Sequence, residues 1–124
     1  MHNSLARVVC RSGFQSRSAD LLKRLHWLPV NERIRYKLAV LTFKSRLYGK
    51  PSYLADLLTP YQPKRNLRSS DTGTLAVPDV RSAAGRRAFA FAAPTLWNSL
   101  PFSLRSCKTL STFCGILKTY LFPP

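Results

Sequence analysis

The five acidic side chains are the first candidates for chemistry in this sequence. Asp20, Glu32, Asp56, Asp71 and Asp79 occur singly and are scattered along 124 residues. Metal-assisted phosphoryl transfer needs several carboxylates converging on two ions about 3.5–4 Å apart. No pair or cluster of acids offers that arrangement, so we expect no catalytic residue and no enzymatic activity.

The cysteines and the internal histidine do not fall into a recognised reactive pattern either. Cys107 and Cys114 are separated by six residues, and Cys10 and His26 are distant from both. This matches no zinc-finger or zinc-knuckle spacing, and no acid is positioned to orient His26 as a general base. The glycines are isolated, so no phosphate-binding loop is predicted. We therefore expect no metal, no cofactor and no small-molecule substrate.

The basic side chains carry the strongest signal. Twenty Lys and Arg residues against five acids give a net charge of +15, which favours the phosphate backbone of RNA or DNA as partner and an acidic membrane surface second. The alternative is a basic surface that is merely solvated or that docks on another domain. The candidate nucleic-acid-binding residues are Arg33, Lys37, Lys44, Lys64, Arg65, Arg68, Arg81, Arg86 and Arg87. Tyr61 is available to stack on a base.

Apolar periodicity predicts the helices that position these cations. Spacings of three and four residues predict helices over Asn3–Arg11, Ala19–His26, Asn31–Tyr48 and Leu110–Phe122, with shorter ones after Ser52 and Pro94. Ile34, Leu38 and Leu41 lie on one side of the third helix, and Tyr36, Val40, Phe43 and Leu47 lie on the opposite side. A helix that is apolar on two sides is expected to be covered on both. Arg33, Lys37 and Lys44 form a stripe between these sides.

The rest of the chain is expected to be irregular or extended. Residues 60–75 form a predicted basic loop with Lys64, Arg65 and Arg68, and Leu75–Val77 and Ala88–Ala92 are predicted to pair as a short β-hairpin flanked by Arg81, Arg86 and Arg87. The predicted fold class is mainly α: a small bundle of four to five helices with a short β-hairpin and a basic loop. Residues 1–17 are expected to be a short helix and linker, and 18–124 a single basic helical domain. The predicted core residues are Trp27, Ile34, Leu38, Leu41, Phe43, Leu57, Phe89, Phe91, Trp97, Phe113, Leu117 and Leu121.

Two similar sequences are predicted to end helices. His26, Trp27 and Pro29 lie in one, and Trp97, Asn98 and Pro101 lie in the other. In both, a Leu-Pro pair follows the tryptophan, and a proline forces the preceding residue out of helical geometry. We therefore interpret these six residues as structural, with each tryptophan buried.

A series of short segments extends along almost the whole chain in a fixed order. They are Leu25–Val30, Arg33–Ile34, Tyr36–Leu38, Pro51–Leu54, Asp56–Leu58, Leu67–Ser70, Arg87–Phe89, Ala92–Pro94, Leu96–Pro101, Leu104–Ser106, Phe113 and Leu117–Phe122. In these segments and their order, the chain resembles the region downstream of the polymerase domain in LINE-type (non-LTR) retrotransposon reverse transcriptases. Arg17–Asp20 departs from the His-Ile-Thr-Pro that similar proteins often carry, and Cys114 stands where they usually have lysine.

This resemblance implies descent from an element that encodes an RNA-directed DNA polymerase, although the polymerase palm and the endonuclease are absent from this sequence. It implies a non-catalytic segment that packs on a polymerase domain and helps to hold RNA or DNA. An autonomous RNA-binding module, a protein-docking element and a translated relic without independent function remain alternatives. The odd number of cysteines and the absence of an apolar run near the roughly 18 residues of a membrane span lead us to expect no transmembrane span and an intracellular protein of the nucleus or cytoplasm.

Overall fold

The structure is a computed structural model that describes residues 2–65, 68 and 73–122, and this part of the chain is mainly helical. Five helices have seven residues or more: α1 (His2–Cys10), α2 (Ser18–Arg24), α3 (Val30–Tyr48), α6 (Phe89–Ser99) and α8 (Leu110–Leu121). Three are single turns: α4 (Ser52–Ala55), α5 (Ala83–Arg86) and α7 (Phe102–Arg105). The predicted mainly α class is confirmed, and the bounds of α1, α2, α3 and α8 fall within two residues of the predicted ones.

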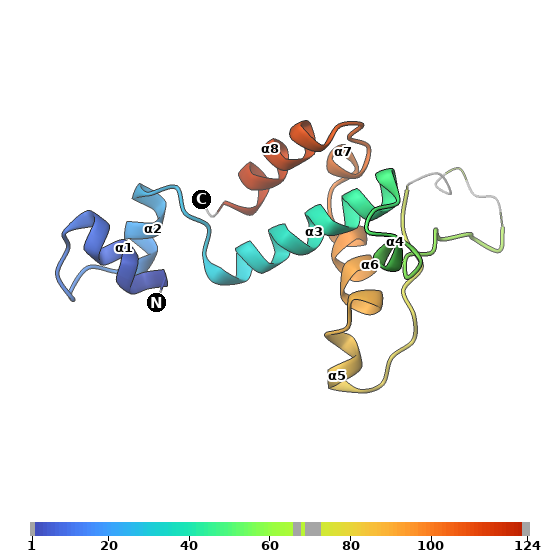
Figure 1. Cartoon of the computed structure of the whole chain (residues 1–124), viewed down its shortest axis with the longest axis horizontal. Coiled ribbons are helices and arrows are strands. Elements are labelled where there is room, and N and C mark those ends of the chain that lie inside the picture. The colour runs from blue at the N-terminus through green and yellow to red at the C-terminus, as the bar shows by residue number, and fades with distance from the viewer. Residues whose placement is uncertain (1, 66–67, 69–72, 123–124) are drawn as a thin grey trace.

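Helix α3 is the axis on which the other long helices of the main core pack. Helix α6 crosses it, α8 runs along another side, and α4 folds back beside its C-terminal end (Figure 1). The residues of α3 that make this packing possible are small: Ala39, Thr42 and Ser45 are all buried. Thr42 tolerates burial because its hydroxyl donates a hydrogen bond of 2.8 Å to the carbonyl of Leu38. Small side chains therefore let the neighbouring helices approach the α3 backbone closely.

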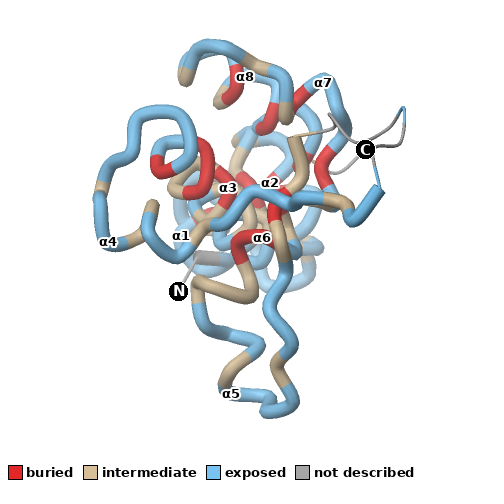
Figure 2. Tube along the Cα trace, turned by 90° about the vertical axis from the view of Figure 1, so that its right-hand side faces the viewer, coloured by how far each residue is buried: buried red, intermediate tan, exposed pale blue. Residues whose placement is uncertain are grey.

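An aromatic cluster forms the centre of the main core where α3, α6 and α8 meet. The ring of Phe43 stacks on that of Phe113 at 4.4 Å between centroids, and the Trp97 ring lies 5.8 Å from Phe113. Each such pair adds about 0.5–1.5 kcal/mol to what burial of the rings contributes. Leu104 and Leu117 complete the same cluster, so side chains from four helices share one core. Figure 2 marks the buried segments of these helices in red along the backbone.

Helices α1 and α2 form a second, smaller cluster around Ala6, Leu21 and Leu22. The predicted boundary at residue 18 therefore runs between two helices that pack together. Helix α2 ends at Arg24 and is followed by Leu25 and by His26, whose φ of 52° is in the left-handed region. The N–H groups of His26 and Trp27 donate back to the carbonyls of Lys23 and Leu22 at 3.1 and 2.9 Å, which closes the helix as a Schellman motif.

The predicted β-hairpin is wrong, because Phe89–Ala92 belongs to α6. Ala88–Ala92 alternates alanine with phenylalanine and so imitates the two-residue period of a strand, but alanine has the highest helix propensity of all residues. Helix α6 consequently begins five residues before Pro94. Leu75 forms an isolated antiparallel bridge with Pro60 instead.

The predicted double cover of α3 is also wrong. Ile34 is 60% exposed, and Leu38 and Leu41 are only partly buried. On the opposite side Phe43 is buried, whereas Leu47 is 48% exposed. The predicted core residue Leu57 is 47% exposed as well. Trp27, Phe89 and Phe91, which were also expected in the core, are partly buried. One apolar side of α3 therefore remains open.

Candidate nucleic-acid interface

The predicted basic loop is closed at its base by backbone pairing. The Tyr61 N–H donates to the Thr74 carbonyl at 3.1 Å, and the Ala76 N–H donates to the Thr59 carbonyl at 2.8 Å. The chain thus leaves this point of the molecule at Tyr61 and returns to it at Thr74, beside α4 and α6 (Figure 1). Lys64, Arg65 and Arg68 lie in this loop and are exposed. Positions 66, 67 and 69–72 of the predicted loop lie outside the described residues.

Two adjacent side chains of α6 fix the base of the loop. The amide of Asn98 receives the Leu75 N–H on Oδ1 at 2.9 Å and donates from Nδ2 to the Leu75 carbonyl at 2.8 Å. The indole N–H of Trp97 donates to the Gly73 carbonyl at 2.9 Å. Since Trp97 is 1% exposed and part of the aromatic cluster, the loop base is tied directly to the core.

One further arginine lies at this base, and a second is close enough for its charge to act on the first. The guanidinium carbon of Arg46, on α3, lies 5.3 Å from the centroid of the Trp97 ring, and the same side chain borders Gly73. Arg105, on α7, donates from Nε to the Leu100 carbonyl at 3.0 Å. Burial first, and then the positive charge of Arg105, lower the pKa of Arg46. Arginine nevertheless stays protonated at neutral pH, so Arg46 brings a positive charge to the base of this segment and Arg105 adds to the local positive potential.

Three of the predicted cations border a groove elsewhere on α3. Arg33 and Lys37 of α3 and Arg87 between α5 and α6 line it, together with Lys118 of α8, which was not predicted as a site residue. Lys44 is exposed two turns further along α3. Arg81 and Arg86 are exposed beside and within α5, which lies at the opposite end of the molecule from α8 (Figure 1). The nine predicted residues therefore do not form one surface.

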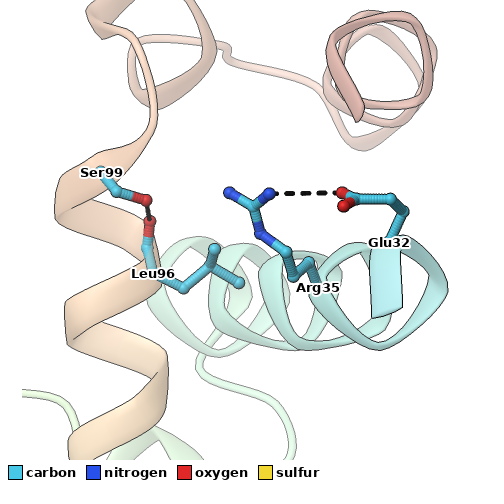
Figure 3. A network of polar contacts seen from close by, with 4 residues as sticks. All are labelled: Glu32, Arg35, Leu96 and Ser99. Atoms are coloured by element: carbon cyan, nitrogen blue, oxygen red, sulfur yellow. Dashed lines mark hydrogen bonds and ion pairs between the residues drawn. The ribbon is translucent and has the colours of Figure 1, made fainter. Parts of the chain in front are cut away.

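The carboxylates cannot neutralise this charge. Glu32 forms an ion pair with Arg35 at 3.3 Å on α3, next to the α6 residues Leu96 and Ser99 (Figure 3). Asp20, Asp56 and Asp79 are exposed and Asp71 lies outside the described residues. Five acids can pair one-to-one with at most five of the twenty cations, so strong positive potential remains on the surface.

No candidate metal or disulfide site accompanies these cations in the described part of the chain. No three His, Cys, Asp or Glu side chains gather there in a way that could hold a metal ion. Cys10, Cys107 and Cys114 are free thiols and partly buried. Within residues 2–65, 68 and 73–122, we find no helix whose length and hydropathy would let it cross a bilayer.

The six residues that were predicted to be structural at the two helix ends differ in their burial and in their contacts. Trp97 is buried and Asn98 holds the loop, whereas Trp27 is only partly buried, contrary to prediction. Pro29 and Pro101 immediately precede α3 and α7. His26 terminates α2 and its ring lies 5.8 Å from that of Phe122.

Sequence reasoning does not join Arg46 to Arg105, because they lie far apart in the chain, on α3 and α7, and only the packing of the helices brings their charges within range of each other. The exposed side of α3 alone would not distinguish Arg46 from its neighbours. Arg105 does belong to Leu104–Ser106, one of the segments that carry the family resemblance.

Comparison with known proteins found no relative of this chain. No protein-family model matches the sequence. No curated protein matches it significantly, and no solved structure does so either.

Proposed function

We propose that this chain is a non-catalytic, nucleic-acid-binding segment of a reverse transcriptase-like protein, and that it holds RNA or DNA through the phosphate backbone. The observation that supports the proposal is that Lys64, Arg65 and Arg68 are exposed between two chain ends that pair at Tyr61 and Thr74. Trp97 and Asn98 hold the adjoining residues Gly73 and Leu75 to the core, and Arg46 lies on the Trp97 ring. The resemblance to LINE-type reverse transcriptases supports the same partner class.

Phosphates suit this site for electrostatic reasons. The charge of Arg105 adds to the positive potential at Arg46, and a phosphate near both side chains would gain an attraction to each that outweighs their mutual repulsion. Lys64, Arg65 and Arg68 would extend the contact along the backbone, and the exposed ring of Tyr61 at the loop base would stack on a base. Contacts of this kind depend on the phosphate charge and do not distinguish one base sequence from another.

A salt titration tests the proposal. The triple variant Lys64→Gln, Arg65→Gln, Arg68→Gln should bind single-stranded RNA and duplex DNA with a log Kd–log [salt] slope reduced by about 2–3, because each lost phosphate contact releases about one counterion fewer. The matched control is Arg11→Gln, Arg17→Gln, Arg24→Gln, which removes the same charge from exposed positions of the α1–α2 unit.

Equal slopes for the two triple variants would show that net charge, and not the loop, drives binding. A wild-type affinity no higher than that of an unrelated protein of similar size and charge would remove nucleic-acid binding altogether. Filter binding between 50 and 300 mM NaCl, with the fold monitored by circular dichroism, provides both measurements.

A further inference from the structure

The open side of α3 is the floor of a large apolar groove. Val30, Ile34, Leu38 and Leu41 line it from α3, and Phe89 lines it from the first turn of α6. Ile34 and Val30 are 60% and 53% exposed. Its volume of 1470 Å³ exceeds the roughly 300–1,000 Å³ of ordinary small-molecule pockets. The groove therefore fits a segment of a macromolecule better than a small ligand.

The apolar positions follow one another at helical spacing. Val30, Ile34, Leu38 and Leu41 are separated by four, four and three residues and so form one stripe along α3. At a rise of 1.5 Å per residue this stripe is about 16 Å long, which corresponds to three turns of a second helix. Helix α6 at Phe89 and helix α8 at Lys118 border it from other directions.

The charges at the groove are all positive. Lys37, Arg87 and Lys118 reach it from three different elements, and none of the described residues that line it is an aspartate or a glutamate. A bound segment with acidic side chains beside its apolar stripe would complement both features of the groove. A second copy of this chain would bring the same cations face to face, on a molecule of net charge +15.

We propose that this groove binds an amphipathic helix of a partner protein whose apolar stripe is flanked by Asp and Glu residues. The apolar stripe of that helix packs on Ile34, Leu38 and Leu41, and its carboxylates face Lys37, Arg87 and Lys118. Arg33, Lys37 and Arg87, which the sequence assigns to nucleic acid, then border a protein-binding surface. This inference does not depend on the proposed function, because the basic loop lies at the other end of α3.

A peptide-binding experiment with the full chain tests the proposal. The probe is an 18-residue fluorescent peptide with leucines at helical spacing and glutamates on both flanks. A shuffled peptide of identical composition controls for simple charge attraction, and a peptide with lysines in place of the glutamates tests complementarity. The amphipathic acidic peptide should bind at least tenfold more tightly than either control in fluorescence anisotropy.

Two pairs of variants locate the site. Ile34→Gln should weaken binding about tenfold, whereas Ile116→Gln, the same change at an exposed position of α8 outside the groove, should leave it unchanged. Lys37→Gln with Lys118→Gln should weaken binding three- to tenfold, and Lys44→Gln with Lys108→Gln, which removes equal charge, should not. Ile34→Gln preserves net charge, so RNA binding through the loop should persist in this variant. The proposal of nucleic-acid binding and the proposal of helix binding can therefore fail separately.

Three outcomes would overturn the inference. The first is equal affinity for the amphipathic and shuffled acidic peptides. The second is binding to phosphatidylserine vesicles that Ile34→Gln abolishes, while the amphipathic acidic peptide binds no better than its controls. This would identify a lipid surface as the occupant. The third is a dimer in sedimentation that Ile34→Gln dissociates, which would identify a second copy.

Discussion

At the scale of single residues, Asn98 has the most specific role in the structure. Beside the bridge of Leu75 with Pro60, the Asn98 side chain pairs with Leu75 as a neighbouring strand would. It accepts from the backbone N–H and donates to the backbone carbonyl of this one buried residue. An amide is the side-chain group that offers a donor and an acceptor side by side. Aspartate would retain only the acceptor, and leucine of similar size would retain neither.

Asn98→Leu should therefore lower the free energy of unfolding by about 1–3 kcal/mol, since it leaves buried backbone groups without partners. Urea denaturation measures this loss. Ser99→Ala is the control, because the Ser99 hydroxyl bonds only the Leu96 carbonyl among the described contacts and is exposed (Figure 3), and it should change stability by less than about 0.5 kcal/mol. Similar losses for both variants would contradict the role assigned to Asn98.

His26 provides a second residue-scale prediction. Its φ of 52° is unfavourable for any side chain with a Cβ but not for glycine. His26→Gly and His26→Ala both remove the ring contact with Phe122, so their difference isolates the backbone. The glycine variant should be the more stable by about 1 kcal/mol.

At position 19, which lies within α2, the variant with glycine should instead be less stable than the protein with its own alanine. There Ala19→Gly should cost about 0.5–1 kcal/mol, the usual penalty for glycine inside a helix. Thermal unfolding of the three variants checks both signs. A glycine at position 26 that is no better than alanine would show that α2 does not end in the left-handed conformation.

At the scale of elements, the two apolar sides of α3 contribute unequally to the free energy of unfolding. Phe43 is 2% exposed and stacked on Phe113, so Phe43→Ala should lower the free energy of unfolding by about 3–5 kcal/mol. Ile34→Ala, on the open face, should change it by less than about 0.5 kcal/mol. Chemical denaturation compares them. A large cost at Ile34 in the isolated chain would mean that the groove is already covered.

Helical periodicity predicted the elements that have a long apolar stripe of their own. Helices α3 and α8 were placed almost at their observed bounds from this pattern. Helix α6 was predicted only from Pro94 onward, and its first five residues were missed because the alternation of Ala88–Ala92 imitates a strand. The single turns α5 and α7 have too few residues to show a period, whereas α4 was predicted as a short helix at Ser52.

The packing face of α3 was predicted wrongly for a related reason. Hydrophobicity favoured the large side chains Ile34 and Leu41, but Ala39, Thr42 and Ser45 are the residues that let other helices come close. Which stripe is buried depends on the shapes of the partner helices, and one sequence does not reveal these. For the same reason, the effect of the Arg105 charge on Arg46 could not be predicted.

At the scale of the whole molecule, the charge of +15 opposes folding through self-repulsion. Raising NaCl from 20 to 300 mM should therefore increase Tm, because screening weakens repulsion between exposed cations. A gain of about 1 kcal/mol corresponds to roughly 4 °C for a domain of this size. Differential scanning fluorimetry in chloride, an anion with little specific affinity for arginine pairs, measures the shift. A fall in Tm would indicate a fold held by ion pairs.

The contacts at the base of the basic loop also determine whether two fragments of the chain, cut within the loop, can reassociate. A cut in the loop near Arg65 leaves α3 in one piece and α6 and α8 in the other. The rings of Phe43 on one side, and of Trp97 and Phe113 on the other, still belong to one cluster, and Thr59 and Tyr61 still pair with Ala76 and Thr74 across the cut. The two pieces therefore have what fragment complementation requires: neither contains the core alone, and each carries the surface that the other needs.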